Sequence, residues 1–240
     1  MILVDYFKVY VYAVEIGASA TALIGWLNNH GKVRTIFNEA QADISKDRNN
    51  GRLIILAYLV ANLTRWTTHY IAFVRLYTVK EPLQLAVMLH REAIISAQVG
   101  AAKSMEKERL TEDAVQFCDL INSHAFWTGL ETVIGDIEPI CYGTNINQSD
   151  STRADQVLLT LVGMFLHFKD HPEPDVATAM VKRLEKRWKS CDQPLFILAL
   201  ILNPYEGLSC FGSTANLNHF KCNNLLILVC HLCPLSQTIQ

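Results

Sequence analysis

The densest group of side chains that could do chemistry is a set of basic residues near the C-terminal third of the chain. They are Lys182, Arg183, Lys186, Arg187 and Lys189, and only Glu185 interrupts them. Lysine and arginine at such spacing can neutralise the phosphates of a nucleic-acid backbone without discriminating between sequences. The same residue types also form ordinary solvated helix faces. We predict that they lie on one helix, opposite an apolar stripe from Val176 to Trp188, and both interpretations stay open.

A second group combines the thiol and imidazole ligands that zinc prefers. It comprises His219, Cys222, Cys230, His231 and Cys233. Structural zinc sites usually pair their ligands in short knuckles that are bounded by turn residues. Here the two halves are separated by the aliphatic run Leu225–Val229, which is typical of a core. We therefore predict no metal site in this segment.

Candidates for catalysis are few. Cys118 with His124, and Cys191 with His171, are close only in sequence, and neither pair has a glycine signature or an oxyanion element beside it. We predict buried cysteines there. No phosphate-binding loop, dinucleotide fingerprint, nucleophile elbow or zincin motif occurs in the sequence. Nucleotide-binding and hydrolase functions therefore lack their usual support.

Asp5 comes after a short apolar stretch, as a metal-binding carboxylate does in nuclease folds. Two-metal phosphoryl chemistry needs several carboxylates that converge within a few ångströms. The residues after Asp5 have helical spacing, with no glycine turn and no second strand. We therefore predict that Asp5 is an N-cap or a first-turn acid of a helix.

The composition is that of a folded protein. The chain has 240 residues, of which 50% are hydrophobic and 18% charged, and its formal net charge is −2. Wholesale disorder and a bulk polycation for nucleic acid are both excluded. The longest uncharged apolar runs are far shorter than the roughly 20 residues of a membrane helix, so we interpret them as buried helix segments. They are Leu53–Leu63, Leu195–Leu202 and Leu225–Cys230.

Cysteine usage and the N-terminus bear on the compartment. Seven cysteines, an odd number, are scattered along the chain, which does not resemble a secreted disulfide framework. The N-terminus lacks the basic start and small-residue cleavage site of a secretory signal. We predict reduced thiols in a nuclear or cytoplasmic protein that is not secreted and does not enter a membrane.

Helical spacing dominates wherever a period can be recognised, and strict alternation is almost absent. We predict a mostly α fold, an irregular helical bundle in which strands make up less than about a fifth of the residues. In the N-terminal half we expect one aromatic-rich helix from Tyr6 to Ala18, one long or bent buried helix over Leu53–Tyr77, and a helix from Pro82 to about Met88.

In the C-terminal half, the spacing predicts four helices. The first has its cap at Thr111, the second opens at Ser123, the third is capped by Asp150 or Ser151, and the last carries the Val176–Trp188 stripe. We expect Pro139 to end or kink the second helix, Gly143–Asp150 to be a loop, and His171–Pro174 to break the chain.

These patterns divide the chain into three regions. Residues 1–90 form a helical segment, residues 91–205 a second helical region, and residues 206–240 an atypical apolar tail. After Ser190 only Asp192, Glu206 and Lys221 are charged. A folded surface usually carries more charge than that, so we expect the tail to be either a buried strip from a larger domain or sequence that never evolved as a surface.

The segment Thr64-Arg65-Trp66-Thr67-Thr68, on an apolar stretch, resembles the Arg-Trp motif of hAT-superfamily transposases of the fungal type. Further pieces agree with this family in order and spacing. They are Val4–Phe7, Phe126-Trp127-x-x-Leu130, Ile137–Ile140, the stretch from Asp155 onward, Arg187–Leu195 and Ala199–Pro204. The resemblance covers about residues 4–205 and mainly the family's helical insertion domain.

The resemblance implies a protein without catalysis of its own. Family members cut and join DNA with a ribonuclease-H-like core, whose two Asp and one Glu hold magnesium, and the helical insertion domain interrupts that core. We expect this sequence to begin after both Asp and to end before the Glu. It would then be a catalytically incomplete, transposase-derived fragment, with no catalytic residue, no metal ligands and no cofactor. A nuclear location is implied by the family.

The resemblance also assigns two roles. In the family the Trp of the motif stabilises a base turned out of the duplex, which would fall to Trp66, with Arg65 as a phosphate partner. Alternatively, Trp66 is a core residue between Leu63 and Tyr70. The expected partners are DNA, bound weakly and without sequence preference, and a second copy of the chain, rather than a small molecule. The alternative function is a domesticated α-helical module that binds protein or DNA.

Overall fold

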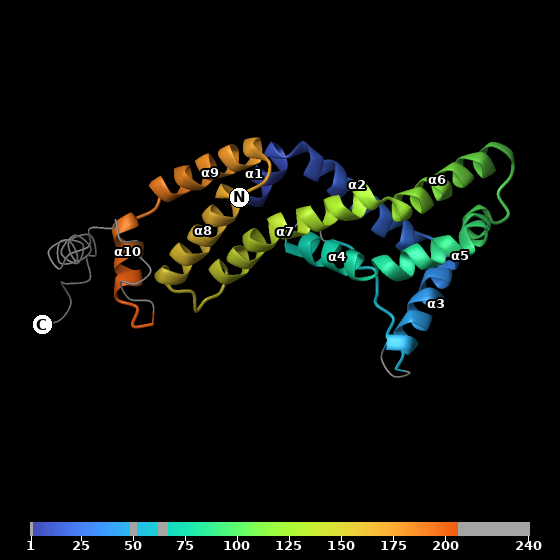
Figure 1. The fold of residues 1–240 in the computed structure, drawn as a ribbon, viewed down its shortest axis with the longest axis horizontal. Helices are drawn as coiled ribbons and strands as arrows, with labels where there is room; N and C mark the ends of the chain where they lie inside the picture. The colour runs from blue at the N-terminus through green and yellow to red at the C-terminus, as the bar shows by residue number, and fades with distance from the viewer. Residues whose placement is uncertain (1, 49–51, 62–66, 206–240) are drawn as a thin grey trace, which may run out of the picture. The chain divides into compact units, whose positions relative to one another are not determined.

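The computed structural model describes residues 2–48, 52–61 and 67–205. Ten helices account for 82% of these described residues, and no strand occurs among them, which confirms the mostly α class (Figure 1). The helices are α1 (Ile2–Val9), α2 (Val11–Asn29), α3 (Gly31–Arg48), α4 (Thr67–Thr78), α5 (Lys80–Val99), α6 (Ser104–Asn122), α7 (His124–Asn147), α8 (Ala154–Lys169), α9 (Pro174–Lys189) and α10 (Gln193–Ile201).

The chain forms two compact units. Among the described residues, unit 1 comprises 2–9 and 139–205, and unit 2 comprises those between 10 and 138. The expected division after residue 90 falls within α5, at His90, where the backbone leaves helical geometry (φ −131°, ψ 24°). The N-terminal part of α5 matches the helix expected from Pro82, although α5 begins at Lys80 and runs beyond the kink to Val99.

In unit 2, α3 packs on α5 and α5 packs on α6, with α2 against α3. Trp26 is buried, stacks on Phe117 with ring centroids 4.8 Å apart, and donates its indole N–H to Gln98. Trp127 is fully buried and donates its indole N–H to the carbonyl of Ile121 at 2.6 Å. The mainly aliphatic core of this unit therefore includes two tryptophans, and the indole N–H of each has a hydrogen-bond partner.

The prediction that Thr111 caps a helix is wrong, because α6 begins seven residues earlier, at Ser104. The Thr111 hydroxyl donates to the carbonyl of Lys107 at 2.8 Å, which is the bond of a threonine inside a helix. The cap expected at Ser123 is confirmed, since its hydroxyl accepts from the N–H of Phe126 near the start of α7.

The prediction of a buried helix over Leu53–Tyr77 is wrong for its first part and is confirmed from Thr67 onward, where α4 buries Ala72, Phe73 and Leu76. Residues 52–61 have no helix and helix α4 begins only at Thr67 (Figure 1), while residues 62–66 lie outside the described part. The β-branched pair Ile54-Ile55 favours extended backbone, and side chains of α2 and α3 bind the polar groups of that backbone. A run in which nearly every residue is apolar shows no helical period. Its hydrophobicity alone therefore could not tell a buried helix from an extended segment.

In unit 1, α9 packs on α1 and α8, and α10 packs on α8. The expected stripe on α9 is confirmed, since Val176, Met180 and Leu184 are buried. The single helix expected from Tyr6 to Ala18 is interrupted at Tyr10, whose backbone is extended (φ −107°, ψ 90°). The break expected at His171–Pro174 is confirmed by the gap between α8 and α9.

Helix α7 does not end at Pro139, and residues 143–147 of the expected loop are helical. The Thr144 hydroxyl donates to the carbonyl of Ile140 at 2.7 Å, so the chain keeps helical bonding beyond the proline. Neither Asp150 nor Ser151 caps α8. Its N-cap is Arg153, whose backbone N–H donates to the Gln156 side chain at 3.0 Å in a capping box.

Candidate functional site

Helix α9 is specified by strong local signals at both ends. Glu173 is its N-cap residue, Pro174 occupies the first turn, where its fixed φ suits a helix start, and Asp175 is also in that turn. Basic residues lie in the last turn, where their positive charge interacts favourably with the negative end of the helix dipole. The basic side chains are therefore held on a well-defined helix.

The expectation that all five basic residues lie opposite the apolar stripe is wrong for two of them. Arg183 and Arg187 come seven residues after Val176 and Met180, about two helical turns, so they point to nearly the same side as the stripe. Both arginines are half-buried. The seven-residue spacing was visible in the sequence and could have revealed this.

The two arginines face Asp5 of α1. Arg187 Nη2 donates to Asp5 Oδ2 at 2.6 Å, and Arg183 Nε lies 3.9 Å from Asp5 Oδ1. Burial raises the pKa of Asp5, but the hydrogen bond and charge of Arg187 outweigh it and hold this pKa below its ordinary value. Asp5 is a first-turn acid, as predicted, and its ion pair across 182 residues of sequence was not foreseen.

The remaining basic side chains, Lys182, Lys186 and Lys189, are exposed, and no ion pair joins them to a described acidic side chain. Together with the two arginines they line an open hollow of about 1250 Å³, and its other lining residues are Asp5, Glu185, Ser190 and Cys191. The Nε atom of Arg187 is buried there and has no hydrogen-bond partner among the described residues. This basic hollow, as we call it, offers several cation donors and N–H groups to an anion, which suits phosphate oxygens.

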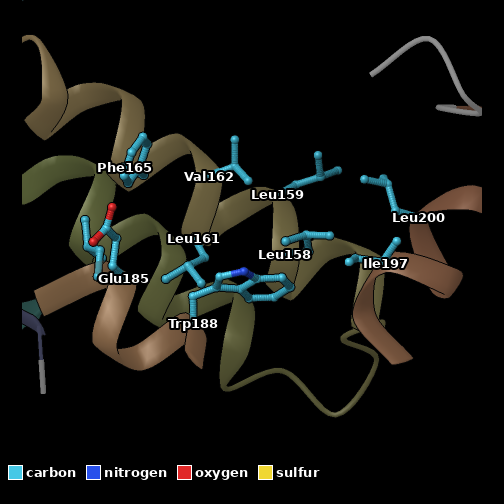
Figure 2. Close-up of a pocket in the computed structure, with 10 residues that line it drawn as sticks. Leu158, Leu159, Leu161, Val162, Phe165, Glu185, Trp188, Ile197 and Leu200 are labelled. Carbon is cyan, nitrogen blue, oxygen red and sulfur yellow. The ribbon is translucent and has the colours of Figure 1, made fainter. Parts of the chain in front are cut away.

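A second concave surface in unit 1 is apolar. Figure 2 shows the indole of Trp188 among the side chains of α8 and α10, close to Leu158 and Ile197. This apolar groove is open, has a volume of about 520 Å³, and has Glu185 as its single charged lining residue. Its full lining is Leu158, Leu159, Leu161, Val162, Phe165, Leu184, Glu185, Trp188, Ile197 and Leu200.

A buried carboxylate positions the helices that form this groove. Asp155, 3% exposed, accepts bonds from Nε and Nη2 of Arg153, both at 3.0 Å, and from the Asn203 amide at 2.7 Å. The Arg153 hydrogen bonds outweigh burial and lower the pKa of Asp155. Because Asn203 comes after α10, Asp155 ties the end of α10 to the start of α8.

Several sequence candidates fall outside the described residues. They are Arg65, Trp66, His219, Cys222, Cys230, His231 and Cys233. Within the described ranges, no group of three or more His, Cys, Asp and Glu side chains could hold a metal ion.

Among the described residues, the structure records no hydrogen bond between Cys118 and His124 or between Cys191 and His171, which a nucleophile and its base would form. Cys118 is buried as predicted, and burial raises the pKa of its thiol to about 11, which disfavours the nucleophilic thiolate. Cys191 is only partly buried, so the prediction of a buried cysteine is wrong there. Its thiol donates to the carbonyl of Arg187, one turn earlier. His171 accepts from the N–H of Glu173 at 3.0 Å, at the break before α9.

Of the helices that the structure describes, none is by itself long and apolar enough to cross a membrane. Helices α1 and α2 reach that length and composition only when taken together, and the helix breaks between them at Tyr10.

No protein-family model, no curated protein and no solved structure matches this chain.

Proposed function

We propose that this chain is a catalytically incomplete, hAT transposase-derived helical protein that binds the phosphate backbone of DNA through the basic hollow of unit 1. The observation that carries the proposal is the cluster on α9, where three exposed lysines surround two arginines and a buried, unpartnered Arg187 Nε. The order of the transposase-like motifs between Val4 and Pro204 supports the ancestry, and the mostly helical structure of the described residues agrees with it. A nuclear location is part of the same proposal, because it rests on that ancestry.

The strength of binding depends on the charges that remain available. Five basic side chains and two carboxylates, Asp5 and Glu185, line the hollow, so we expect about three phosphate contacts, made mainly by Lys182, Lys186 and Lys189. The logarithm of affinity should then fall against the logarithm of salt concentration with a slope of about −3. Between about 50 and 200 mM salt this slope amounts to a roughly 60-fold loss, within a non-specific Kd range of about 10⁻⁴ to 10⁻⁶ M.

Duplex binding measured by fluorescence anisotropy tests this proposal. The triple change Lys182→Gln, Lys186→Gln and Lys189→Gln should weaken binding at least about tenfold and flatten the salt dependence. A matched control changes three exposed lysines of unit 2, Lys32, Lys103 and Lys107, and should shift affinity less than about twofold. Equal losses in both triple variants would reject the basic hollow as the binding site.

Asp5→Asn distinguishes phosphate binding from catalysis. Removal of this carboxylate frees Arg183 and Arg187, so DNA binding should become stronger and the salt slope steeper by about one. A catalytic carboxylate behaves in the opposite way, since its loss abolishes magnesium-dependent nicking of a supercoiled plasmid. Nicking that survives stringent purification and disappears in Asp5→Asn would overturn the proposal that the chain is not an enzyme.

A second candidate function is binding of the apolar face of an amphipathic helix from a partner protein, and the apolar groove favours it. Its volume lies within the roughly 300–1000 Å³ of ordinary ligand pockets. Binding of the dye anilinonaphthalene sulfonate probes whether the groove is accessible. Val162→Arg, at a half-exposed lining position, should reduce dye binding, whereas Leu166→Arg, one turn along α8 and outside the lining, should not. Equal effects would reject this candidate.

A further inference from the structure

The extended segment 52–61 of unit 2 is bound along one edge by side chains of α2 and α3. Ser45 Oγ donates to the carbonyl of Arg52 at 3.1 Å and accepts from the N–H of Ile54 at 2.7 Å. Gln41 binds both polar groups of Leu56, with distances of 2.9 Å to the N–H and 3.3 Å to the carbonyl. Asn28 donates to the carbonyl of Tyr58 at 3.0 Å. Figure 1 shows this segment returning alongside α3.

All of these bonded backbone groups belong to even-numbered residues. In extended backbone, the N–H and C=O of successive residues point to opposite edges. The odd-numbered residues therefore present their N–H and C=O groups to the edge that faces away from Gln41 and Ser45. Arg75 Nη1 donates to the carbonyl of Ala57 at 3.4 Å on that side. No hydrogen bond is recorded between the backbone of Leu53 or Ile55 and another described residue.

The side chains of this segment do nothing to block the open edge. Leu53 is 53% exposed and Ile55 45% exposed, and Arg52 is the single charged residue between positions 52 and 61. Natural proteins usually protect an exposed edge with lysine, proline or a bulge, because unpaired N–H and C=O groups are a template for another strand. Here the bonds to the even-numbered residues fix the segment in place, and they leave the backbone groups of Leu53 and Ile55 free to pair with another strand.

We infer that this edge pairs with the same segment of a second copy of the chain, antiparallel, about a two-fold axis at Ile55. Leu53 then faces Ala57 of the partner, and Ile55 faces its own copy, so every pair joins two outward-facing residues. The surface is self-complementary, as a two-fold interface requires. The Ala57 carbonyl has two lone pairs and can accept from Arg75 and from the partner together.

Charge favours the antiparallel arrangement over the parallel one. With the axis at Ile55, Arg52 faces Tyr58 of the partner, so the two copies of Arg52 lie roughly 20 Å apart. That separation exceeds the Debye length of about 10 Å at 0.1 M salt. A parallel pairing in register would place the two guanidinium groups side by side. This inference concerns unit 2 and does not rest on the proposed DNA binding.

Amide hydrogen exchange of the full chain at low and high protein concentration tests the inference directly. The amides of Leu53 and Ile55 should gain at least about tenfold protection as concentration rises. The amides of Ile54 and Leu56, already bonded to Ser45 and Gln41, should be protected at both concentrations. Concentration-independent protection of Leu53 and Ile55 would show that another part of the same chain covers the edge, and would overturn the inference.

Sedimentation of variants provides the second test. Ile55→Pro removes the N–H at the axis, and Ile55→Lys places two like charges there, so each should weaken dimerisation at least about tenfold. Val60→Lys adds the same charge at a more exposed aliphatic position outside the paired residues and should change it less than about threefold. A monomer at every concentration, or equal weakening by Val60→Lys, would overturn the inference.

Discussion

The two units fasten their outlying segments by different chemistry. In unit 1, two carboxylates do this, since Asp5 joins α1 to α9 and Asp155 joins the start of α8 to Asn203 after α10. In unit 2, mainly neutral groups fasten the extended segment, with the largest share from Gln41 and Ser45 of α3 and one longer bond from Arg75. Hydrogen bonds to carboxylates in unit 1 thus correspond to mainly neutral hydrogen bonds in unit 2.

This difference teaches what should disturb each unit. A carboxylate can be protonated and its field is screened by salt, whereas an amide or hydroxyl near neutral pH can only be removed or displaced. A buried neutral group that loses its partner still bears the full cost of desolvation. We therefore expect unit 1 to respond to pH and unit 2 to respond mainly to loss of its hydrogen bonds.

The largest effect should come from Gln41→Ala in unit 2. Gln41 is buried and makes three hydrogen bonds, two to the backbone of Leu56 and one to the Tyr58 hydroxyl at 2.8 Å. At about 1 kcal/mol for each bond, we expect a loss of about 3 kcal/mol in the free energy of unfolding of unit 2. Hydrogen exchange, resolved by unit, measures this loss. Gln116→Ala, at an exposed glutamine of the same unit, should cost less than about 0.5 kcal/mol.

The next effect should come from Asp155→Asn in unit 1. The change removes a buried charge that accepts three hydrogen bonds, and the new amide would keep the shape of the side chain while losing the charge-assisted bonds. We expect a loss of about 2 kcal/mol, less than for Gln41, because Arg153 is largely exposed and regains water. Asp170→Asn, at an exposed aspartate directly after α8, serves as the control. Equal losses for Asp155 and Asp170 would contradict a special role for the buried carboxylate.

Much of the fold could be predicted from the sequence where apolar positions recur every three or four residues. The stripe Val176, Met180 and Leu184 indicated α9, and the proline-rich His171–Pro174 indicated its start. Prediction failed where every residue is apolar, as in most of 52–61, because a run without period does not separate helix from extended backbone. There the conformation depends on hydrogen bonds from Gln41 and Ser45, which precede their partners by 7 to 15 residues and lie outside any local hydrophobic pattern.

The basic hollow was predicted in composition and only partly in geometry. The five basic residues were found, but the pairing of Arg183 and Arg187 with Asp5 was not, because it joins helices that lie far apart in the sequence. Helical spacing alone could have placed both arginines near the buried stripe. The role of Asp155 gave no signal in the sequence, since an aspartate near a helix start is expected to serve the helix itself.

Acid should lower the stability of unit 1 more than that of unit 2. We expect this loss to be smaller than the loss from Gln41→Ala or from Asp155→Asn. The pKa of Asp155 and that of Asp5 lie below 3.8 in the folded state, so the unfolded chain takes up protons first as the pH falls. The stability that these carboxylates contribute is complete well above pH 3.8 and is lost as the pH falls through their lowered folded-state pKa values. Unit 1 should therefore lose stability there.

Asp155→Asn provides the control for the acid response. Since this variant has no carboxyl group to titrate at position 155, its stability should fall less steeply below pH 3.8 than that of the unchanged chain. Thermal melts at a series of pH values, together with hydrogen exchange in unit 1, measure the slope. An unchanged slope would mean that other carboxyl groups govern the acid response, and the comparison between the units would fail on this point.

The smallest effect should come from an ion pair in unit 2 that looks strong by distance alone. Arg91 Nη2 lies 2.7 Å from Asp119 Oδ1, about as close as Arg187 lies to Asp5. Its side chains are 37% and 62% exposed, so water and salt screen the attraction, and ordering two long side chains opposes it. We expect Arg91→Gln to lower the unfolding free energy of unit 2 by less than about 1 kcal/mol.

If it instead costs as much as Asp155→Asn, then charge at any depth stabilises this protein, and burial is not what separates the two units. If the cost is small and vanishes in high salt, the ionic bonds of unit 1 matter because Asp155 is buried, and an ion pair of equal length at the surface of unit 2 contributes almost nothing.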